Sequence, residues 1–218
     1  MLREKLKALW YHTARIACRV FCVIFFRLRV YGRENIPETG GFILASNHQS
    51  YLDPLFCGSC LNRQLWFFAR DSLFINRFFG RLIASVNAIP VNLDKPDIST
   101  IKAVIAKLKE GKGICLFPEG TRTSDGRISP FKHGLGLLCR RGDAAVVPVL
   151  IDGAFECWSR QKKIFSPGHV TVNYGQSISA DQVKGMDDDK LAEVLTETLR
   201  RMQAQCRIKR NKEPYSYE

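Results

Sequence analysis

The stretch 41-GFILASNHQSYLDP-54 decides the fold of this chain. It begins with an apolar run, residues 41–45. Two glycines, Gly40 and Gly41, mark the start of this run, and the sequence Ser-Asn-His follows it. Short apolar runs with such boundaries are typical of buried strands. The strand would deliver His48 into a loop, and Pro54 suits the first turn of a following helix. Loops at strand ends are where α/β proteins place reactive groups.

The spacing of His48 and Asp53 allows a turn to bring the carboxylate back to the imidazole. A carboxylate bonded to one ring nitrogen fixes the tautomer and stabilises the imidazolium, which leaves the other nitrogen free as a general base. Asp53 is also predicted to be the N-cap of the helix that begins at Pro54. This stretch alone therefore leaves open an alternative, in which Asp53 only caps the helix and His48 is an ordinary loop histidine.

A second apolar run leads into a polar turn in the stretch 113-GICLFPEGTR-122. Gly120 lets the backbone approach a ligand closely, and Thr121 adds a hydroxyl. Arg122 can grip a phosphate or carboxylate with two parallel hydrogen bonds. Glu119 would steer Arg122 or bind a substrate hydroxyl. Taken alone, the stretch is also compatible with an ordinary turn at a strand end, but the two stretches together indicate a site.

Together these motifs resemble the glycerophospholipid acyltransferases typified by 1-acylglycerol-3-phosphate acyltransferase. The likeness rests on Asn47-His48 with Asp53, spaced as His-x4-Asp, on residues 117–122 and on Val-Pro-Val at 147–149. Residues 68–74, 79–80 and 131–134 add to it, so it covers about residues 42–152. It implies that His48 is the base and Asp53 its orienting group, and that the acceptor is bound by Glu119, Gly120, Thr121, Arg122, Arg70 and Lys132.

The resemblance also implies the reaction. A fatty acyl group would move from a thioester of coenzyme A or acyl carrier protein to the free hydroxyl of lysophosphatidic acid, giving phosphatidic acid. The acyl group is already activated as a thioester, so neither a metal nor a bound cofactor is expected. The chain has no G-x-S-x-G elbow, which agrees with direct attack by the acceptor hydroxyl. Backbone amides near the His48 loop are the expected oxyanion donors.

One departure from the family pattern concerns the acceptor. Members that act on glycerol phosphate usually carry an arginine shortly after an Ile-Pro-Val-like strand, whereas residues 89–95 read IPVNLDK. Lys95 is the nearest cation, and a lysine does not replace the bidentate fork of arginine. Transfer to another lysophospholipid or to an aminolipid therefore stays open. Two further alternatives are hydrolysis of the acyl donor and a non-catalytic peripheral protein that binds anionic lipid.

The charge balance indicates an anionic partner. The 218 residues include 33 Lys and Arg against 21 Asp and Glu, a formal net charge of +12. Zinc-finger spacing, RNA-binding signatures and a basic helix-turn-helix pattern are all missing, so an anionic bilayer surface is favoured over nucleic acid. The eight cysteines are scattered through apolar runs. This is typical of reduced thiols in the cytosol, and a functional dithiol at Cys57 and Cys60 is not favoured.

Residues 1–28 are predicted to form an amphipathic helix that associates with a membrane. Basic residues gather on one side of this helix, and another side carries a stripe with helical spacing, formed by Leu2, Leu6, Leu9, Thr13, Ile16, Val20 and Ile24. Interspersed arginines disfavour a transmembrane span, and no signal-peptide cleavage site is evident. We expect a peripheral or monotopic protein on the cytoplasmic face of a membrane. The alternative is a helix packed onto the protein's own core.

Residues 29–208 are predicted to form a single α/β acyltransferase domain. Strands and helices alternate through residues 42–151, which indicates a largely parallel central sheet flanked by helices. Residues 73–86 are apolar, and a membrane-facing patch, an acyl-chain lining and core packing are all compatible with them. Residues 169–174 are predicted to be an edge strand. The basic tail, residues 209–218, is predicted to be disordered.

Overall fold

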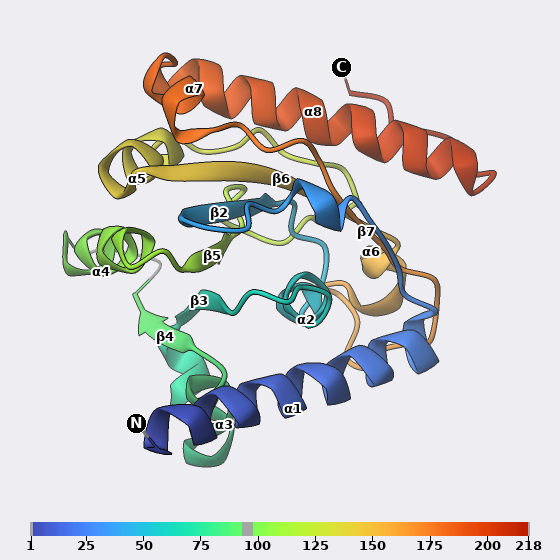
Figure 1. Cartoon of the computed structure of the whole chain (residues 1–218). Coiled ribbons are helices and arrows are strands. Elements are labelled where there is room, and N and C mark those ends of the chain that lie inside the picture. The colour runs from blue at the N-terminus through green and yellow to red at the C-terminus, as the bar shows by residue number, and fades with distance from the viewer. Residues whose placement is uncertain (1, 93–97, 218) are drawn as a thin grey trace.

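The centre of the molecule is a seven-stranded sheet with the order β1-β7-β6-β2-β5-β3-β4 (Figure 1). The computed structural model describes residues 2–92 and 98–217. Neighbouring strands run parallel except for β6 and β7, which confirms the predicted largely parallel sheet. The strands are β1 (Arg29–Tyr31), β2 (Gly41–Ser46), β3 (Leu65–Arg70), β4 (Ala88–Val91), β5 (Gly113–Leu116), β6 (Ala144–Asp152) and β7 (Thr171–Tyr174).

Helices cover both faces of the sheet. One face is covered by α4 (Ile98–Lys109), α5 (Leu135–Gly142), α7 (Ala180–Lys184) and α8 (Asp188–Lys209), and the other by α1 (Leu2–Phe26), α2 (Asp53–Ser59) and α6 (Ala154–Trp158). The remaining elements are α3 (Arg77–Ser85) and the 3-10 turns η1 (Arg33–Asn35) and η2 (Asp71–Phe74). Lys95 lies outside the described residues.

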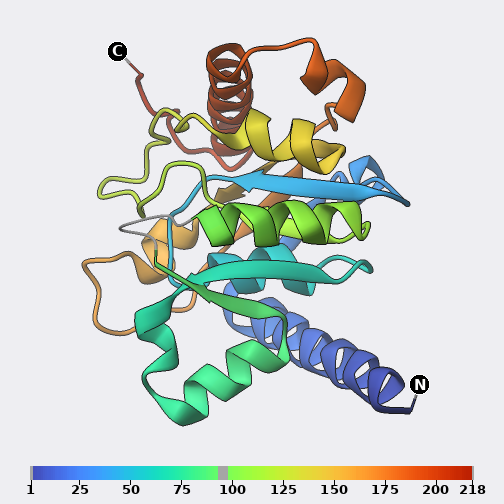
Figure 2. The same ribbon diagram turned by 90° about the vertical axis from the view of Figure 1, so that its left-hand side faces the viewer.

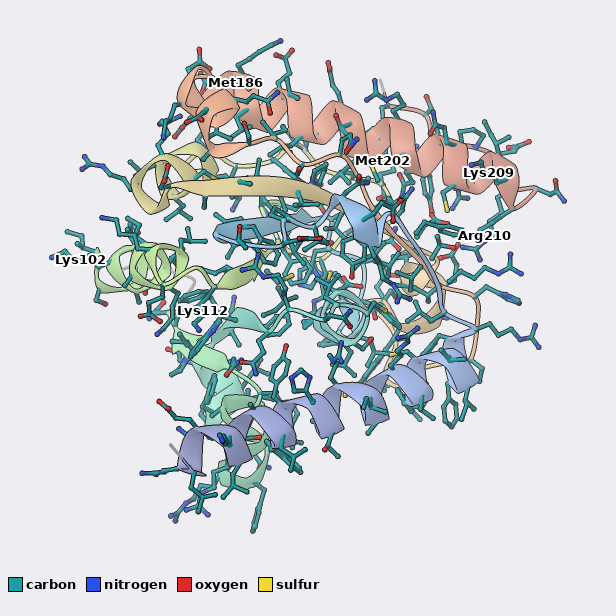
Figure 3. The ribbon with its side chains drawn as sticks, in the orientation of Figure 1. Lys102, Lys112, Met186, Met202, Lys209 and Arg210 are labelled. Atoms are coloured by element: carbon teal, nitrogen blue, oxygen red, sulfur yellow. The ribbon has the colours of Figure 1, made fainter. Side chains whose placement is uncertain are left out.

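Strand β2 separates two hydrophobic cores. Its side chains alternate, so Phe42 and Leu44 enter the core beneath α1 and α2, whereas Ile43 and Ala45 enter the core beneath α4, α5 and α8. Figure 3 labels Met202 on the side of α8 that faces the sheet, where it joins the second core. All six residues of β2 are buried, so the polar loop that follows the strand has a rigid base.

The carboxyl ends of β2, β5 and β3 meet at one edge of the sheet, because these strands are parallel neighbours. Figure 2 shows the long loops after β5 and α6 together at this edge, on the left of the view. Strand β7 pairs with both β1 and β6. The prediction of an edge strand at residues 169–174 is therefore wrong, since β1 covers that edge.

Helix α1 packs against the domain by a narrow face and exposes the predicted apolar stripe. Tyr11, Cys22 and Phe26 are buried, and the Tyr11 hydroxyl accepts a hydrogen bond from the amide of Leu65 (3.0 Å). The members of the stripe are exposed. By length and composition α1 is also apolar enough to cross a membrane, and only 17% of its most apolar window is buried.

The sequence predicts disorder for residues 209–218, whereas two tyrosines of the described tail, Tyr215 and Tyr217, contact the domain. The Tyr217 hydroxyl accepts a hydrogen bond from the amide of Ile128 (3.0 Å) and donates one to the Gln203 side chain. Tyr215 stacks on Arg207, with the guanidinium carbon 4.0 Å from the ring centre. These tyrosines supply apolar contacts, which the basic composition of the tail does not indicate.

The hydroxyl of Tyr217 provides a test of this packing. Tyr217→Phe should lower the free energy of unfolding by about 1–3 kcal/mol, because it leaves the partly buried amide of Ile128 without its partner. Urea denaturation measures the change, and Tyr31→Phe on the exposed edge strand β1 is the matched control. Equal stability of the two variants would contradict a docked tail.

Candidate active site

His48, in the loop after β2, is in direct contact with Asp53 at the start of α2. The Nδ1 atom of His48 lies 2.7 Å from Oδ2 of Asp53, and the same oxygen accepts hydrogen bonds from the amides of Gln49 (2.6 Å) and Ser50 (2.7 Å). Asp53 is completely buried. Its carboxylate reaches back to the loop, and the N-cap of α2 is Leu52. The prediction that Asp53 caps the helix is therefore wrong, although the predicted contact with His48 is present.

The contact with Asp53 defines the chemical state of the His48 ring. An ionised carboxylate can only accept hydrogen bonds, so Nδ1 of the imidazole must be the donor. In neutral imidazole the proton is then absent from Nε2, which can accept one from a substrate. Phe117 stacks on the ring with a centroid distance of 4.1 Å and an interplanar angle of 19°. The hydrogen bond and the stacking partner together fix the ring plane.

Glu119 links the two loops of the site. Its Oε1 accepts a hydrogen bond from the amide of His48 (2.6 Å), and its Oε2 accepts one from the amide of Ser129 (2.8 Å). The side chain is 4% exposed. Each oxygen thus accepts a backbone hydrogen bond, and Glu119 joins the loop after β2 to the loop after β5.

Burial raises the pKa of Glu119 from an ordinary 4.5 to about 7. The backbone hydrogen bonds from Ser129 and His48 oppose this rise, and the nearby charge of Asp53 adds to it. The carboxylate that joins the two loops is therefore half protonated near neutral pH.

Arg122 has no hydrogen bond or ion pair within the described part of the chain. The side chain is half-buried, and its Nη1 atom is sealed from solvent without a partner. The guanidinium carbon lies 3.5 Å from the centre of the Tyr51 ring. Buried polar groups in proteins are nearly always paired, so the N–H groups of this guanidinium are available to an acceptor such as an anion.

Lys132 adds a second cation to this turn. Gly120 has a φ of +75°, and a Cβ atom added to it would lie 2.6 Å from Nζ of Lys132. The amide of Lys132 also donates to the carbonyl of Pro118 (2.9 Å). The structure therefore brings Lys132 over the turn that leads to Arg122. Thr121, between Gly120 and Arg122, is exposed.

Arg70 lies at the same edge of the sheet but farther away. Cys115 of β5 is level with Leu44 of β2 and with Phe67 of β3. Arg70, the last residue of β3, is therefore nearly level with the beginning of the His48 loop. Two strand spacings separate them, about 10 Å.

No role was predicted for the amide side chains on either side of His48. Asn47 donates to the carbonyl of Ile151 (2.9 Å) and accepts from its amide (2.7 Å), and Gln49 donates to the carbonyl of Gly126 (3.1 Å). Both side chains are buried, and they tie the His48 loop to β6 and to the loop after β5. Amides on both sides of a histidine after a buried strand were the available signal.

The amides of the His48 loop do not form the expected oxyanion site. The amide of His48 donates to Glu119, and those of Gln49 and Ser50 donate to Asp53. A donor engaged by a carboxylate cannot also stabilise a developing negative charge. For residues 48–50 the prediction is wrong, and these amides instead shape the loop.

A histidine held by a buried carboxylate, in a loop joined to that of an unpaired arginine, suits an enzyme that transfers a group to the hydroxyl of an anionic substrate. Residues 27–152 match the family described as Acyltransferase, and the chain belongs to this family. The resemblance seen in the sequence is thereby confirmed, and the protein is an acyltransferase.

Characterised relatives are similar over most of the chain. The 1-acyl-sn-glycerol-3-phosphate acyltransferase of Bacillus subtilis is 31% identical over 173 residues, which cover 79% of this chain and 84% of the relative. The enzyme of the same name from Streptococcus pneumoniae is 28% identical, with 75% and 60% covered. The crystal structure of the 1-acyl-sn-glycerophosphate acyltransferase PlsC from Thermotoga maritima superposes with a TM-score of 0.76 at 26% identity, over 92% of this chain and 81% of that one.

The raised pKa of Glu119 predicts a pH-dependent stability. Below pH 4.5 the carboxyl is protonated in both states, and between pH 4.5 and about 7 the unfolded chain loses its proton first. The contribution of Glu119 to stability should therefore fall as the pH rises through this window. Glu119→Gln should be less stable by about 1–3 kcal/mol at pH 5, because one backbone donor loses its acceptor.

Chemical denaturation of the wild type and of Glu119→Gln at pH 5 and pH 8 measures this effect. The stability difference between the two proteins should be larger at pH 5 than at pH 8. A constant difference would mean that Glu119 is ionised in the folded protein throughout this range.

Proposed function

We propose that the protein transfers a fatty acyl group from a thioester to the free hydroxyl of lysophosphatidic acid, giving phosphatidic acid. The observation that carries this proposal is the contact of His48 with buried Asp53, in a loop whose Tyr51 stacks on the unpaired guanidinium of Arg122. Two relatives named as 1-acyl-sn-glycerol-3-phosphate acyltransferases support this choice of acceptor.

In the proposed reaction Nε2 of His48 takes the proton of the acceptor hydroxyl. The oxygen attacks the thioester carbonyl, and the tetrahedral intermediate collapses with loss of the thiolate of coenzyme A or acyl carrier protein. The imidazolium returns its proton to this leaving group. Asp53 stabilises the imidazolium and holds the ring during both transfers. The thioester supplies the driving force, so the mechanism assigns no role to a metal or bound cofactor.

Arg122 and Lys132 are proposed to bind the phosphate of the acceptor. Arginine presents a planar fork that matches two phosphate oxygens, and lysine adds a mobile point charge. Gly120 lets the substrate approach the backbone between these cations, and Thr121 adds an exposed hydroxyl. Arg70, at the same sheet edge, supports this assignment by adding positive potential.

An apolar surface on α1 and α3 is proposed to bind the cytoplasmic leaflet of a membrane. The exposed stripe of α1 continues onto Ile75, Phe78 and Leu82, which are also exposed. Trp10 donates to the Ser85 hydroxyl (2.9 Å), so α1 and α3 form one surface at the bottom of both ribbon views (Figures 1 and 2). Arg77 and Arg81 of α3 are also exposed, as expected for a peripheral or monotopic protein on anionic lipid.

The proposed reaction is tested by turnover. Purified protein is incubated with a long-chain acyl-CoA or acyl carrier protein thioester and with lysophosphatidic acid, lysophosphatidylcholine or lysophosphatidylethanolamine. Transfer to lysophosphatidic acid should be fastest. His48→Ala should lower it by a factor of about 100–10,000, the usual contribution of a general base. His169→Ala, at an exposed histidine outside the site, is the matched control.

Other results would revise the proposal in defined ways. Faster transfer to another lysolipid would keep the mechanism and change the acceptor. Consumption of thioester without an acceptor would indicate hydrolysis. Near-normal turnover of His48→Ala would refute the mechanism, and lipid binding without turnover of either donor would favour a non-catalytic lipid-binding protein.

The membrane surface is tested with the double variant Ile75→Ser with Phe78→Ser. These side chains are 80% and 86% exposed. Burial of an apolar side chain contributes about 1.5–3 kcal/mol, so binding to vesicles rich in phosphatidylglycerol should weaken by a factor of about 10 or more. Vesicle co-sedimentation measures the effect.

The matched control is Leu137→Ser with Ile208→Ser, on α5 and α8. These helices cover the opposite face of the sheet from α1. Equal binding by both double variants would refute a membrane role for α3.

A further inference from the structure

The loops after β2 and β5 contact each other through aromatic side chains. Phe117, from the loop after β5, stacks on His48 of the other loop at 4.1 Å. Tyr51, from the loop after β2, stacks on Arg122 of the loop after β5 at 3.5 Å. Each loop thus supplies an aromatic ring that stacks on the functional side chain of the other loop. The proposed base, His48, and the proposed phosphate-binding residue, Arg122, are therefore held by the same pair of loops.

We propose that Tyr51 is a positioning residue that fixes the Arg122 guanidinium for the phosphate monoester of the acceptor. This inference rests on the proposed function. The contact with Tyr51 is the one interaction that the structure gives the Arg122 guanidinium within residues 2–92 and 98–217. An aromatic face attracts a guanidinium and leaves its in-plane N–H groups free for an anion.

The stacking contact restricts a flexible side chain before the substrate binds. An arginine loses about 2 kcal/mol of rotamer entropy when it is immobilised, and a ring that holds it in advance reduces the part lost on binding. Tyr51 lies three residues after His48 in the same loop. Its contact with Arg122 therefore also fixes the position of the guanidinium relative to the His48 ring. A phosphate bound by Arg122 would thereby place the acceptor hydroxyl relative to Nε2 of His48.

The Tyr51 ring is itself packed against a second aromatic residue, Trp158. Its ring lies 5.1 Å from that of Trp158, and the Trp158 indole donates to the carbonyl of Lys162 (3.1 Å). Trp158 in turn contacts Phe165, whose ring lies 6.1 Å from that of Phe25 in α1. A continuous series of aromatic contacts therefore runs from Phe25 of α1 to Tyr51, and Tyr51 contacts Arg122.

The experiment compares Tyr51→Leu, Tyr51→Phe, Arg122→Ala and the double variant Tyr51→Leu with Arg122→Ala. Tyr51→Leu should raise the KM for lysophosphatidic acid by roughly 2- to 30-fold, the range of a cation–π contact. The KM for the thioester and kcat should change less than twofold. Tyr51→Phe keeps the ring and should retain the wild-type KM. Tyr31→Leu is the control, since Tyr31 and Tyr51 are similarly exposed (53% and 48%).

The double variant separates positioning from direct contact with the lipid. If Tyr51 acts through Arg122, Tyr51→Leu should have no further effect once Arg122 is alanine. An effect that persists in the Arg122→Ala background would overturn the inference. Equal changes in the KM of donor and acceptor would overturn it too.

A binding measurement distinguishes failure of the inference from failure of the proposed function. If the wild type acylates no lysolipid, the proposed function fails, and thermal stabilisation by glycerol 3-phosphate then decides the inference. A rise in Tm that both Tyr51→Leu and Arg122→Ala abolish would support it. No rise in the wild type, or a rise that Tyr51→Leu retains, would overturn it.

Discussion

The structure of the site depends on the buried carboxylate of Asp53. Removing a carboxylate from water is unfavourable unless hydrogen bonds compensate for the loss of hydration. Its Oδ2 accepts from His48, Gln49 and Ser50, all within 2.7 Å, and Asp53 lies in the first turn of α2, where the helix dipole favours negative charge. One buried group therefore shapes the loop, begins the helix and orients the imidazole.

A second buried carboxylate extends this order to the neighbouring loop. Glu119 accepts from the amides of His48 and Ser129, and the amide of Thr123 donates to the carbonyl of His48 (2.8 Å). The loops after β2 and β5 are thus joined by backbone hydrogen bonds as well as by stacking. Strand β3 ends at the same edge and leads through η2 into α3, so the site and the proposed membrane surface are adjacent in the fold.

Much of this arrangement could be predicted from the sequence, because it depends on local patterns. Alternating apolar runs and turn residues located the strands, and the spacing of His48 and Asp53 indicated their contact. The task of Glu119, the stacking of Tyr51 and the packing of Tyr217 depend on which loops meet in space. The same limit explains the capping prediction for Asp53, since its three hydrogen-bond donors lie on the preceding loop and outweigh the local helix-start signal.

The protonation of the His48 ring tests the central claim most directly. The position of the proton can be read from nitrogen chemical shifts and couplings in protein labelled with ¹⁵N-histidine, with His48→Ala to assign the signal. We expect that, in the neutral form of the ring, the proton lies on Nδ1, toward Asp53, and Nε2 is unprotonated, and that Asp53→Asn disturbs this preference. A proton on Nε2 of the neutral ring in the wild type would contradict the account, because His48 could not then accept the proton of a hydroxyl.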